Sequence, residues 1–192
     1  MKKIFILLLA VVIFVSCGMP PKNFTYRYES QDTGLKELID INGYYISQHG
    51  CDSTFYSMYM FYPDGLFTIA TTSKILPGLV DCFRNGGKSN ICRYPLWGTY
   101  RLEGDLIKTQ VMRTEGNGFV IFRDYRILPD GKGIVNVSDY VQPEYTNLGY
   151  MANYPSFMQN QCESAAIFYP LDTKRDPAEC PFIGKKWFNV AK

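Results

Sequence analysis

The sequence has a single histidine among 192 residues, and this scarcity argues against several kinds of site. A zinc site needs three or four ligands from suitable side chains, and a cysteine nucleophile needs an activating base beside it. His49 lies close to Cys51, but no second histidine completes either arrangement. We therefore interpret both as loop residues, and we predict no metal, no cofactor and no catalytic residue.

Motifs of the common enzyme classes are missing as well. The sequence has no phosphate-binding loop, no Gly-x-Ser-x-Gly and no paired-histidine motif. Asp64, Asp105 and Asp130 each fall in a predicted turn, where Asp accepts local backbone hydrogen bonds. We assign them to the turns rather than to acid–base chemistry. Because no acid, base and nucleophile can be assembled, the sequence predicts a protein that is not an enzyme.

An excess of charge of one sign is also lacking. Lysine and arginine number 20 against 18 aspartate and glutamate residues, and without Lys2 and Lys3, which belong to the N-terminal segment below, the two signs are equal. Nucleic-acid binding needs a basic patch or stripe. A neutral domain therefore argues against nucleic acid as a partner.

No apolar run reaches the ~20 residues that span a bilayer as a helix. The longest, residues 4–15, follows the basic start Met1-Lys2-Lys3 and is typical of a secretory signal peptide. It ends in FVSCG at residues 14–18, which resembles the lipobox of bacterial lipoproteins. The resemblance implies that residues 1–16 are removed and that Cys17 becomes a lipidated N-terminus. An ordinary secretory signal with a chance cysteine is the alternative.

A lipidated Cys17 attaches the protein to a membrane, because two or more acyl chains anchor stably. Residues 17–33 then form the lipidated N-terminus and its tether, and residues 34–192 form one domain, within the usual size range. In Gram-negative lipoproteins an Asp directly after the cysteine favours the inner membrane, and Gly18 stands there instead. By that resemblance we expect the outer membrane. No acidic cluster follows the cysteine, so we favour the periplasmic face.

Five cysteines remain besides Cys17, and disulfides persist outside the cytoplasm. Five is odd, so at least one thiol should be free. The candidates for pairing are the neighbours along the chain, Cys82 with Cys92 and Cys162 with Cys180. Several other connectivities are compatible with the sequence.

The pattern of turns and alternation predicts a chain of short strands. Trp97 to Lys108 forms a central hairpin turning at Gly104, and Pro-Asp-Gly turns lie at 63–65 and 129–131. Further strands are expected at 43–46, 54–62, 66–72, 107–113, 119–128, 134–137 and 164–169, with long irregular insertions at 74–96 and 142–160. About eight such strands indicate an all-β antiparallel barrel or sandwich.

Three further features complete the organisation. Leu35, Leu38 and Ile39 recur at helical spacing within residues 34–41, which predicts a short helical segment with an apolar face. The strand 54–62 is apolar on both faces, so both must be covered. The tail at 181–188 carries enough apolar bulk to dock on the domain.

The series GYY at 43–45, FYPDGLF at 61–67 and WGTY at 97–100 resembles the lipocalin-like domains of bacterial lipoproteins over residues 38–169. The resemblance implies an up-and-down barrel of about eight strands with a cavity for a small apolar molecule. Aromatic side chains are candidates to line it, with tyrosine hydroxyls orienting a polar head group. The candidates are Tyr45, Phe55, Tyr59, Phe61, Phe67, Trp97, Tyr100, Phe122 and Tyr125.

Two functions follow from these patterns. The first is a lipid-anchored envelope protein that binds a small hydrophobic or amphipathic ligand inside its barrel. A barrel filled by its own side chains is the alternative structure, and it favours the second function. In that case the protein is an interaction module that binds an envelope protein or a glycan through residues 140–154 and the loop between Cys82 and Cys92.

Overall fold

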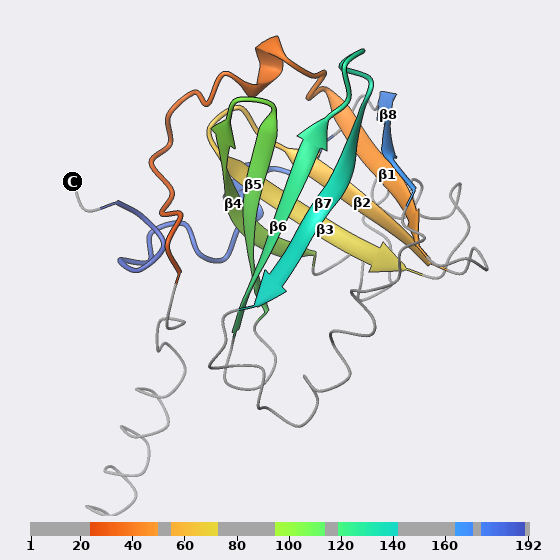
Figure 1. Cartoon of the computed structure of the whole chain (residues 1–192). Coiled ribbons are helices and arrows are strands. Elements are labelled where there is room, and N and C mark those ends of the chain that lie inside the picture. The colour runs from red at the N-terminus through yellow and green to blue at the C-terminus, as the bar shows by residue number, and fades with distance from the viewer. Residues whose placement is uncertain are drawn as a thin grey trace, which may run out of the picture.

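The computed structural model describes residues 24–49, 55–72, 95–113, 119–141, 164–170 and 174–190. These residues form an all-β protein in which eight antiparallel strands close into one barrel, each paired with its neighbour in sequence and β8 with β1 (Figure 1). The predicted fold class, an up-and-down barrel, is confirmed. The strands are β1 (Gly43–His49), β2 (Phe55–Phe61), β3 (Leu66–Thr72), β4 (Leu96–Glu103), β5 (Leu106–Arg113), β6 (Phe119–Ile127), β7 (Gly133–Val141) and β8 (Ala166–Pro170).

Helix is limited, in the described parts of the chain, to two short 3-10 turns, η1 (Leu35–Glu37) and η4 (Pro177–Glu179). No helix among these residues is long and apolar enough to cross a membrane. The short N-terminal helical segment is confirmed in η1. Leu35 is fully buried, but η1 ends at Glu37, so Leu38 leaves the expected apolar face and is exposed.

The predicted turns are present. In the two Pro-Asp-Gly turns the aspartate accepts a hydrogen bond from a backbone N–H two residues on, from Leu66 to Asp64 (3.3 Å) and from Lys132 to Asp130 (3.0 Å). The central hairpin joins β4 to β5 through Gly104, whose φ of +63° is a conformation that glycine adopts without a steric penalty. The turn residues themselves therefore hold successive strands together as neighbours at this end of the barrel.

Two apolar clusters lie on opposite faces of the sheet. The inner cluster takes residues from all eight strands, so it fills the barrel interior. The outer cluster joins the other face of β1 to β6 with residues of the two terminal segments. On β2, Tyr59 and Phe61 belong to the inner cluster, whereas Met58 and Met60 belong to the outer one. The prediction that this strand is covered on both faces is confirmed.

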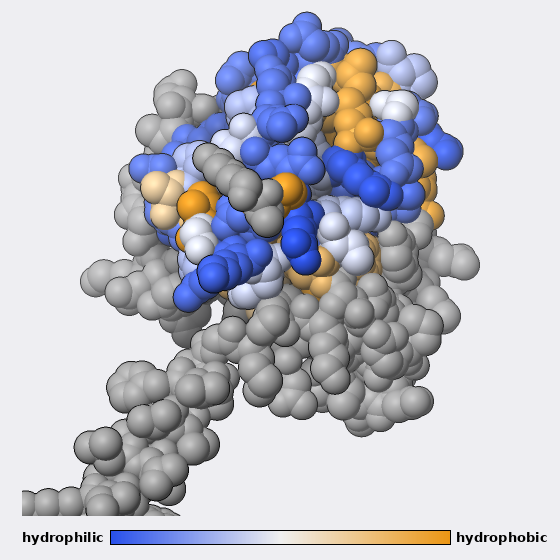
Figure 2. Space-filling model, turned by 90° about the vertical axis from the view of Figure 1, so that its left-hand side faces the viewer, coloured by the Kyte–Doolittle hydropathy of each residue, from blue (hydrophilic) through white to orange (hydrophobic). Residues whose placement is uncertain are grey.

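The terminal segments, residues 24–28 and 180–190, cover the outer cluster (Figure 1). They are joined by backbone hydrogen bonds from Tyr28 N to Phe188 O (2.8 Å) and from Val190 N to Tyr28 O (3.0 Å). Phe182 and Phe188 are buried, so the predicted docking of the tail is confirmed. The surface on this side is mostly hydrophilic (Figure 2).

The cysteine prediction is corrected in one respect. Cys180 is a buried free thiol at the end of η4, within the outer cluster, so the predicted Cys162–Cys180 disulfide is not formed. Burial raises the pKa of the Cys180 thiol, which keeps it in its less reactive protonated form. Cys82 and Cys92 lie outside the described residues.

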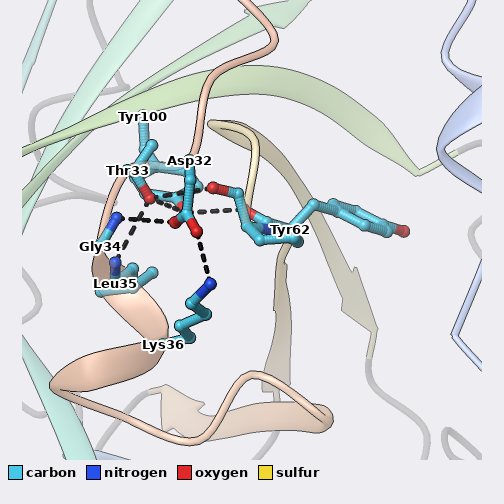
Figure 3. A network of polar contacts seen from close by, with 8 residues as sticks. Asp32, Thr33, Gly34, Leu35, Lys36, Tyr62 and Tyr100 are labelled. Carbon is cyan, nitrogen blue, oxygen red and sulfur yellow. Dashed lines mark hydrogen bonds and ion pairs between the residues drawn. The ribbon is translucent and has the colours of Figure 1, made fainter.

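One end of the barrel is closed by residues 33–41, which we call the plug. Leu35, Ile39 and Ile41 of the plug are buried in the inner cluster. Thr33 holds the plug to the rim: its N–H donates to Pro63 O (2.9 Å), and its hydroxyl lies 2.7 Å from the Tyr100 hydroxyl (Figure 3). At the opposite end, the far end, the strands lead to residues 50–54, 73–94, 114–118 and 142–163, outside the described part of the chain.

Candidate functional site in the barrel interior

The structure divides the nine predicted lining residues into two groups. Those in the inner cluster are Tyr45, Tyr59, Phe61, Phe67, Tyr100 and Tyr125. Trp97 and Phe122 belong to the outer cluster, so they do not line the interior. Trp97 stacks on Tyr62, with ring centroids 5.8 Å apart, and Phe122 meets the Tyr26 ring at 5.7 Å. The side chain of Phe55 lies outside the described residues.

The half of the interior next to the plug is filled by the inward-facing rings themselves. Phe61 contacts Phe67 (centroids 5.0 Å apart) and Tyr100 (5.5 Å), and Tyr59 contacts Tyr125 (5.2 Å). Such pairs add about 0.5–1.5 kcal/mol each beyond the burial of their area. This half is therefore a packed aromatic core that stabilises the barrel.

Two of the tyrosine hydroxyls considered as head-group contacts bind the plug and its rim. Tyr45 donates to Asp40 O (2.8 Å), and Tyr100 donates to Tyr62 O (2.6 Å). Burial raises the pKa of both tyrosines well above the usual value. Both hydroxyls therefore stay protonated and serve as donors at any physiological pH.

Toward the far end the interior carries polar side chains among apolar ones such as Val111 and Leu96, and the sequence patterns did not predict these polar groups. Strand register places Ser47, Ser57 and Thr71 side by side on the inner face of β1, β2 and β3. Ser47 Oγ lies 3.1 Å from the Tyr59 hydroxyl, and Ser57 Oγ lies 2.8 Å from Thr71 Oγ1. These hydroxyl groups therefore form a polar band between the aromatic core and the far end.

Arg123 faces the same half of the interior. It stands opposite Thr109 of β5 and two residues before Tyr125 on β6, so all three share one face of the sheet. Thr109 is fully buried, and Arg123 is only 9% exposed.

The arginines on the outer face of the barrel differ from Arg123 in exposure. Arg101 pairs with Glu103 at 2.7 Å and Arg126 pairs with Asp105 at 3.4 Å, and all four side chains are exposed. A single positive side chain thus joins the polar band, within the described part of the interior.

The signal for this band was present in the sequence. Ser47, Ser57 and Arg123 each lie two residues from a predicted lining residue, namely Tyr45, Tyr59 and Tyr125. Strand alternation puts such neighbours on one face. The expectation of an apolar lining directed attention to the aromatic residues alone.

Together these residues form a two-part surface. Tyr59, Phe67 and Tyr125 provide apolar rings, and the adjoining band provides hydroxyl groups and one guanidinium. Sites for small molecules combine apolar walls with a few polar groups that fix orientation. The arrangement suits an amphipathic molecule. Within the described residues, no three His, Cys, Asp or Glu side chains gather as a metal site requires.

Comparisons with known proteins give no relative: no protein-family model, no curated protein and no solved structure matches the chain. The class of the protein is therefore defined by its own architecture. It is an all-β, closed, eight-stranded antiparallel barrel with a plugged end.

Proposed function

We propose that the chain is a lipid-anchored lipoprotein of the bacterial cell envelope whose lipocalin-like barrel binds a small hydrophobic or amphipathic ligand. The observation that carries the proposal is the change along the barrel interior from a packed aromatic core beside the plug to a region with hydroxyl groups and one guanidinium toward the far end. The aromatic core, sealed by the plug, supplies a rigid apolar floor. The polar band supplies oriented groups beside that floor, so that a ligand has both kinds of contact within reach.

The polar residues of the interior support a ligand-binding role, because the aromatic residues alone account for the packed core. Six inward rings and the plug are enough to close the core at one end. The buried hydroxyls, which pair with one another, and the guanidinium add little apolar burial. A ligand-binding role gives a reason for placing them there.

Native mass spectrometry of the full-length protein, purified from its host membranes in mild detergent, tests ligand binding. We expect a bound small molecule that is released by denaturing extraction and identified by its mass. Protein that has been unfolded, washed and refolded is the control, and it should show the ligand-free mass and regain the extracted compound. A ligand-free mass in both samples, with no displacement of a fluorescent fatty-acid probe, would contradict the proposal.

The membrane anchor gives a separate prediction. Cys17→Ala should release the protein into the soluble fraction and abolish its labelling by radioactive palmitate, because Cys17 is the proposed acylation site. Cys180→Ala is the matched control, since Cys180 is a free thiol buried in the domain, and it should leave both readouts unchanged. Continued membrane attachment and labelling of the Cys17 variant would disprove the anchor.

The outer membrane and its periplasmic face are the proposed location, supported by Gly18 in place of a retention aspartate. The interaction module stays the alternative function. The loop between Cys82 and Cys92 lies outside the described residues, as does nearly all of 140–154, so no structural observation favours the module.

A further inference from the structure

We infer that the C-terminal tail docks on the surface of the membrane that holds the proposed lipid anchor, and that it prefers a bilayer with anionic head groups. This inference rests on the proposed anchor at Cys17, and it assigns a partner to the outside of the barrel rather than to its interior. The docking surface consists of the outward side chains of Arg27, Ile183, Lys185, Lys186, Trp187 and Val190. It lies beside the point at which the anchored chain joins the barrel.

The anchored chain joins the barrel at Phe24. The Phe24 ring is 8% exposed and lies against the rings of Trp187 and Phe188, each with its centroid 5.2 Å away. The two terminal segments therefore lie side by side, at the left of the barrel in Figure 1. Phe24 is seven residues from Cys17, and a chain of that length spans at most about 25 Å. Phe24 and the tail beside it therefore stay within that reach of the lipid.

A turn in the tail directs one apolar and two basic side chains outward. Gly184 has a φ of +88°, a conformation that favours glycine, and Lys185 N donates to Phe182 O (2.9 Å) across the turn. Phe182 is buried in the outer cluster, whereas Ile183 is 42% exposed and the side chains of Lys185 and Lys186 are exposed. The turn thus presents an isoleucine and two ammonium groups on the surface.

The composition of the docking surface suits a lipid surface better than a protein partner. Trp187 is half-buried, and tryptophan is enriched where one end of the ring is apolar and the other is wet, as at a membrane interface. Lysine covers apolar surface with its stem and keeps its charge in the polar layer, but it is depleted from the cores of protein–protein interfaces. Figure 2, which views this side of the protein, shows small apolar areas among hydrophilic ones.

The charge of the two terminal segments is complementary to anionic head groups. Residues 24–28 and 180–190 contain Arg27, Lys185 and Lys186 but no aspartate or glutamate. The nearest acids along the chain are Glu29 and Glu179, of which Glu179 is already paired with a neighbouring arginine at 2.8 Å. A basic residue near an anionic leaflet favours the bound state by about fivefold. The three cations of this surface therefore favour an anionic bilayer over a neutral one.

Quenching of tryptophan fluorescence by brominated lipid tests the docking. The full-length lipoprotein is reconstituted into vesicles of phosphatidylcholine, or of an equimolar mixture with phosphatidylglycerol, in which part of the phosphatidylcholine carries bromine on its acyl chains. Trp187 is the reporter, because the other tryptophan, Trp97, is only 4% exposed. We expect quenching in the mixed vesicles that is weaker in phosphatidylcholine alone and that falls as salt is added. Trp187→Phe should abolish the quenching, and Trp97→Phe should retain it.

A double variant tests the docking surface itself. Ile183→Ser/Lys186→Gln should lower the ratio of docked to undocked protein on the mixed vesicles by about fivefold or more, because it removes one cation and one apolar contact. Ile167→Ser/Lys132→Gln is the matched control, since Ile167 is 45% exposed and Lys132 is exposed beside it. Both lie at β8, on the opposite side of the barrel from the terminal segments (Figure 1). The control should leave the quenching unchanged.

Sedimentation with the vesicles measures the anchor separately from the docking. Protein that sediments without quenching of Trp187 in either vesicle would overturn the docking while supporting the anchor, and it would leave this surface to a protein partner. Equal quenching in the two vesicles would overturn the preference for anionic head groups, and an equal loss in the control variant would overturn the assignment of the surface. Protein that does not sediment would remove the anchor and the inference together. The wild-type measurement needs no variant, so it stands even where a variant fails to fold.

Discussion

Gly98→Ala is expected to lower the free energy of unfolding by more than about 3 kcal/mol, enough to unfold many domains of this size. Gly98 is the third residue of β4 and lies opposite Val111 on β5. A Cβ at this position would stand 1.9 Å from Gln110 O and 2.9 Å from Val111 Cα. These are backbone atoms, so no side-chain rotation relieves the clash. The two strands would have to separate at this pair, which breaks the ladder of hydrogen bonds between β4 and β5.

Gly104→Ala is the matched control within the same hairpin. No atom lies within 4 Å of a Cβ built on Gly104, and only its positive φ opposes the substitution. Its cost should stay near 1–2 kcal/mol. Urea unfolding followed by tryptophan fluorescence measures both variants. A Gly98 variant as stable as the Gly104 variant would show that β4 and β5 do not need this close approach.

The strands were predictable where local chemistry sets them. The bounds of β3 follow from the Pro-Asp-Gly turn before it and the alternation of Phe67 and Ile69 after it, and prediction and structure agree at both ends. The strand predicted at 134–137 was too short, because β7 continues to Val141. In its pairing with β6, Ser138 lies opposite Asp124 and Asn136 lies opposite Tyr125, so Val137 of β7 is an extra residue. Such a bulge changes which residues share a face, so alternation read along the sequence loses its phase there.

The interior was predictable only in part, because both faces of many strands are covered. Trp97 and Phe122 were assigned to the lining since they are aromatic strand residues. On the outside, Phe122 contacts Tyr26 of the N-terminal segment, and Trp97 stacks on Tyr62 of the turn after β2. Contacts between segments so far apart in sequence leave no periodic signal. The buried polar residues were missed for a different reason. Strand alternation puts Arg123 on the same face as Tyr125, but only aromatic residues were considered for the lining, and arginine is rarely buried in proteins.

A buried lysine at the plugged end makes the stability of the protein depend on pH. Lys174 Nζ donates to Ile41 O at 2.6 Å and to Phe61 O, and it lies 4.6 Å from the centroid of the Tyr62 ring. It therefore ties the end of the plug and the end of β2 to the C-terminal tail. Burial lowers the pKa of Lys174 from 10.5 to about 8, although Asp64 and Asp40 oppose the shift by their charge. A neutral amine still has two N–H donors for the two carbonyl groups.

The free energy of unfolding should rise between about pH 8 and pH 10. In this window the folded protein has released the Lys174 proton, whereas the unfolded chain keeps it until about pH 10.5, so the unfolded state binds more protons. The shift corresponds to roughly 3 kcal/mol, of which about 2–3 kcal/mol is recovered by pH 10. Above pH 10 the sign reverses, because burial raises the pKa of Tyr28 to about 12 and the unfolded chain then loses tyrosine protons first. The buried Cys180 thiol, whose pKa is also raised, opposes the gain from about pH 9.

Lys174→Met isolates the lysine from these opposing groups. The difference in unfolding free energy between the wild type and this variant should grow by about 2–3 kcal/mol from pH 7 to pH 10, measured by urea unfolding at each pH. Arg175→Met is the control from the adjacent tail position, and its difference from the wild type should stay constant, because a guanidinium remains charged throughout this range. A constant difference for the Lys174 variant as well would mean that the ammonium keeps its water in the folded protein. The close contacts to Ile41 and Phe61 would then not amount to burial of a charge.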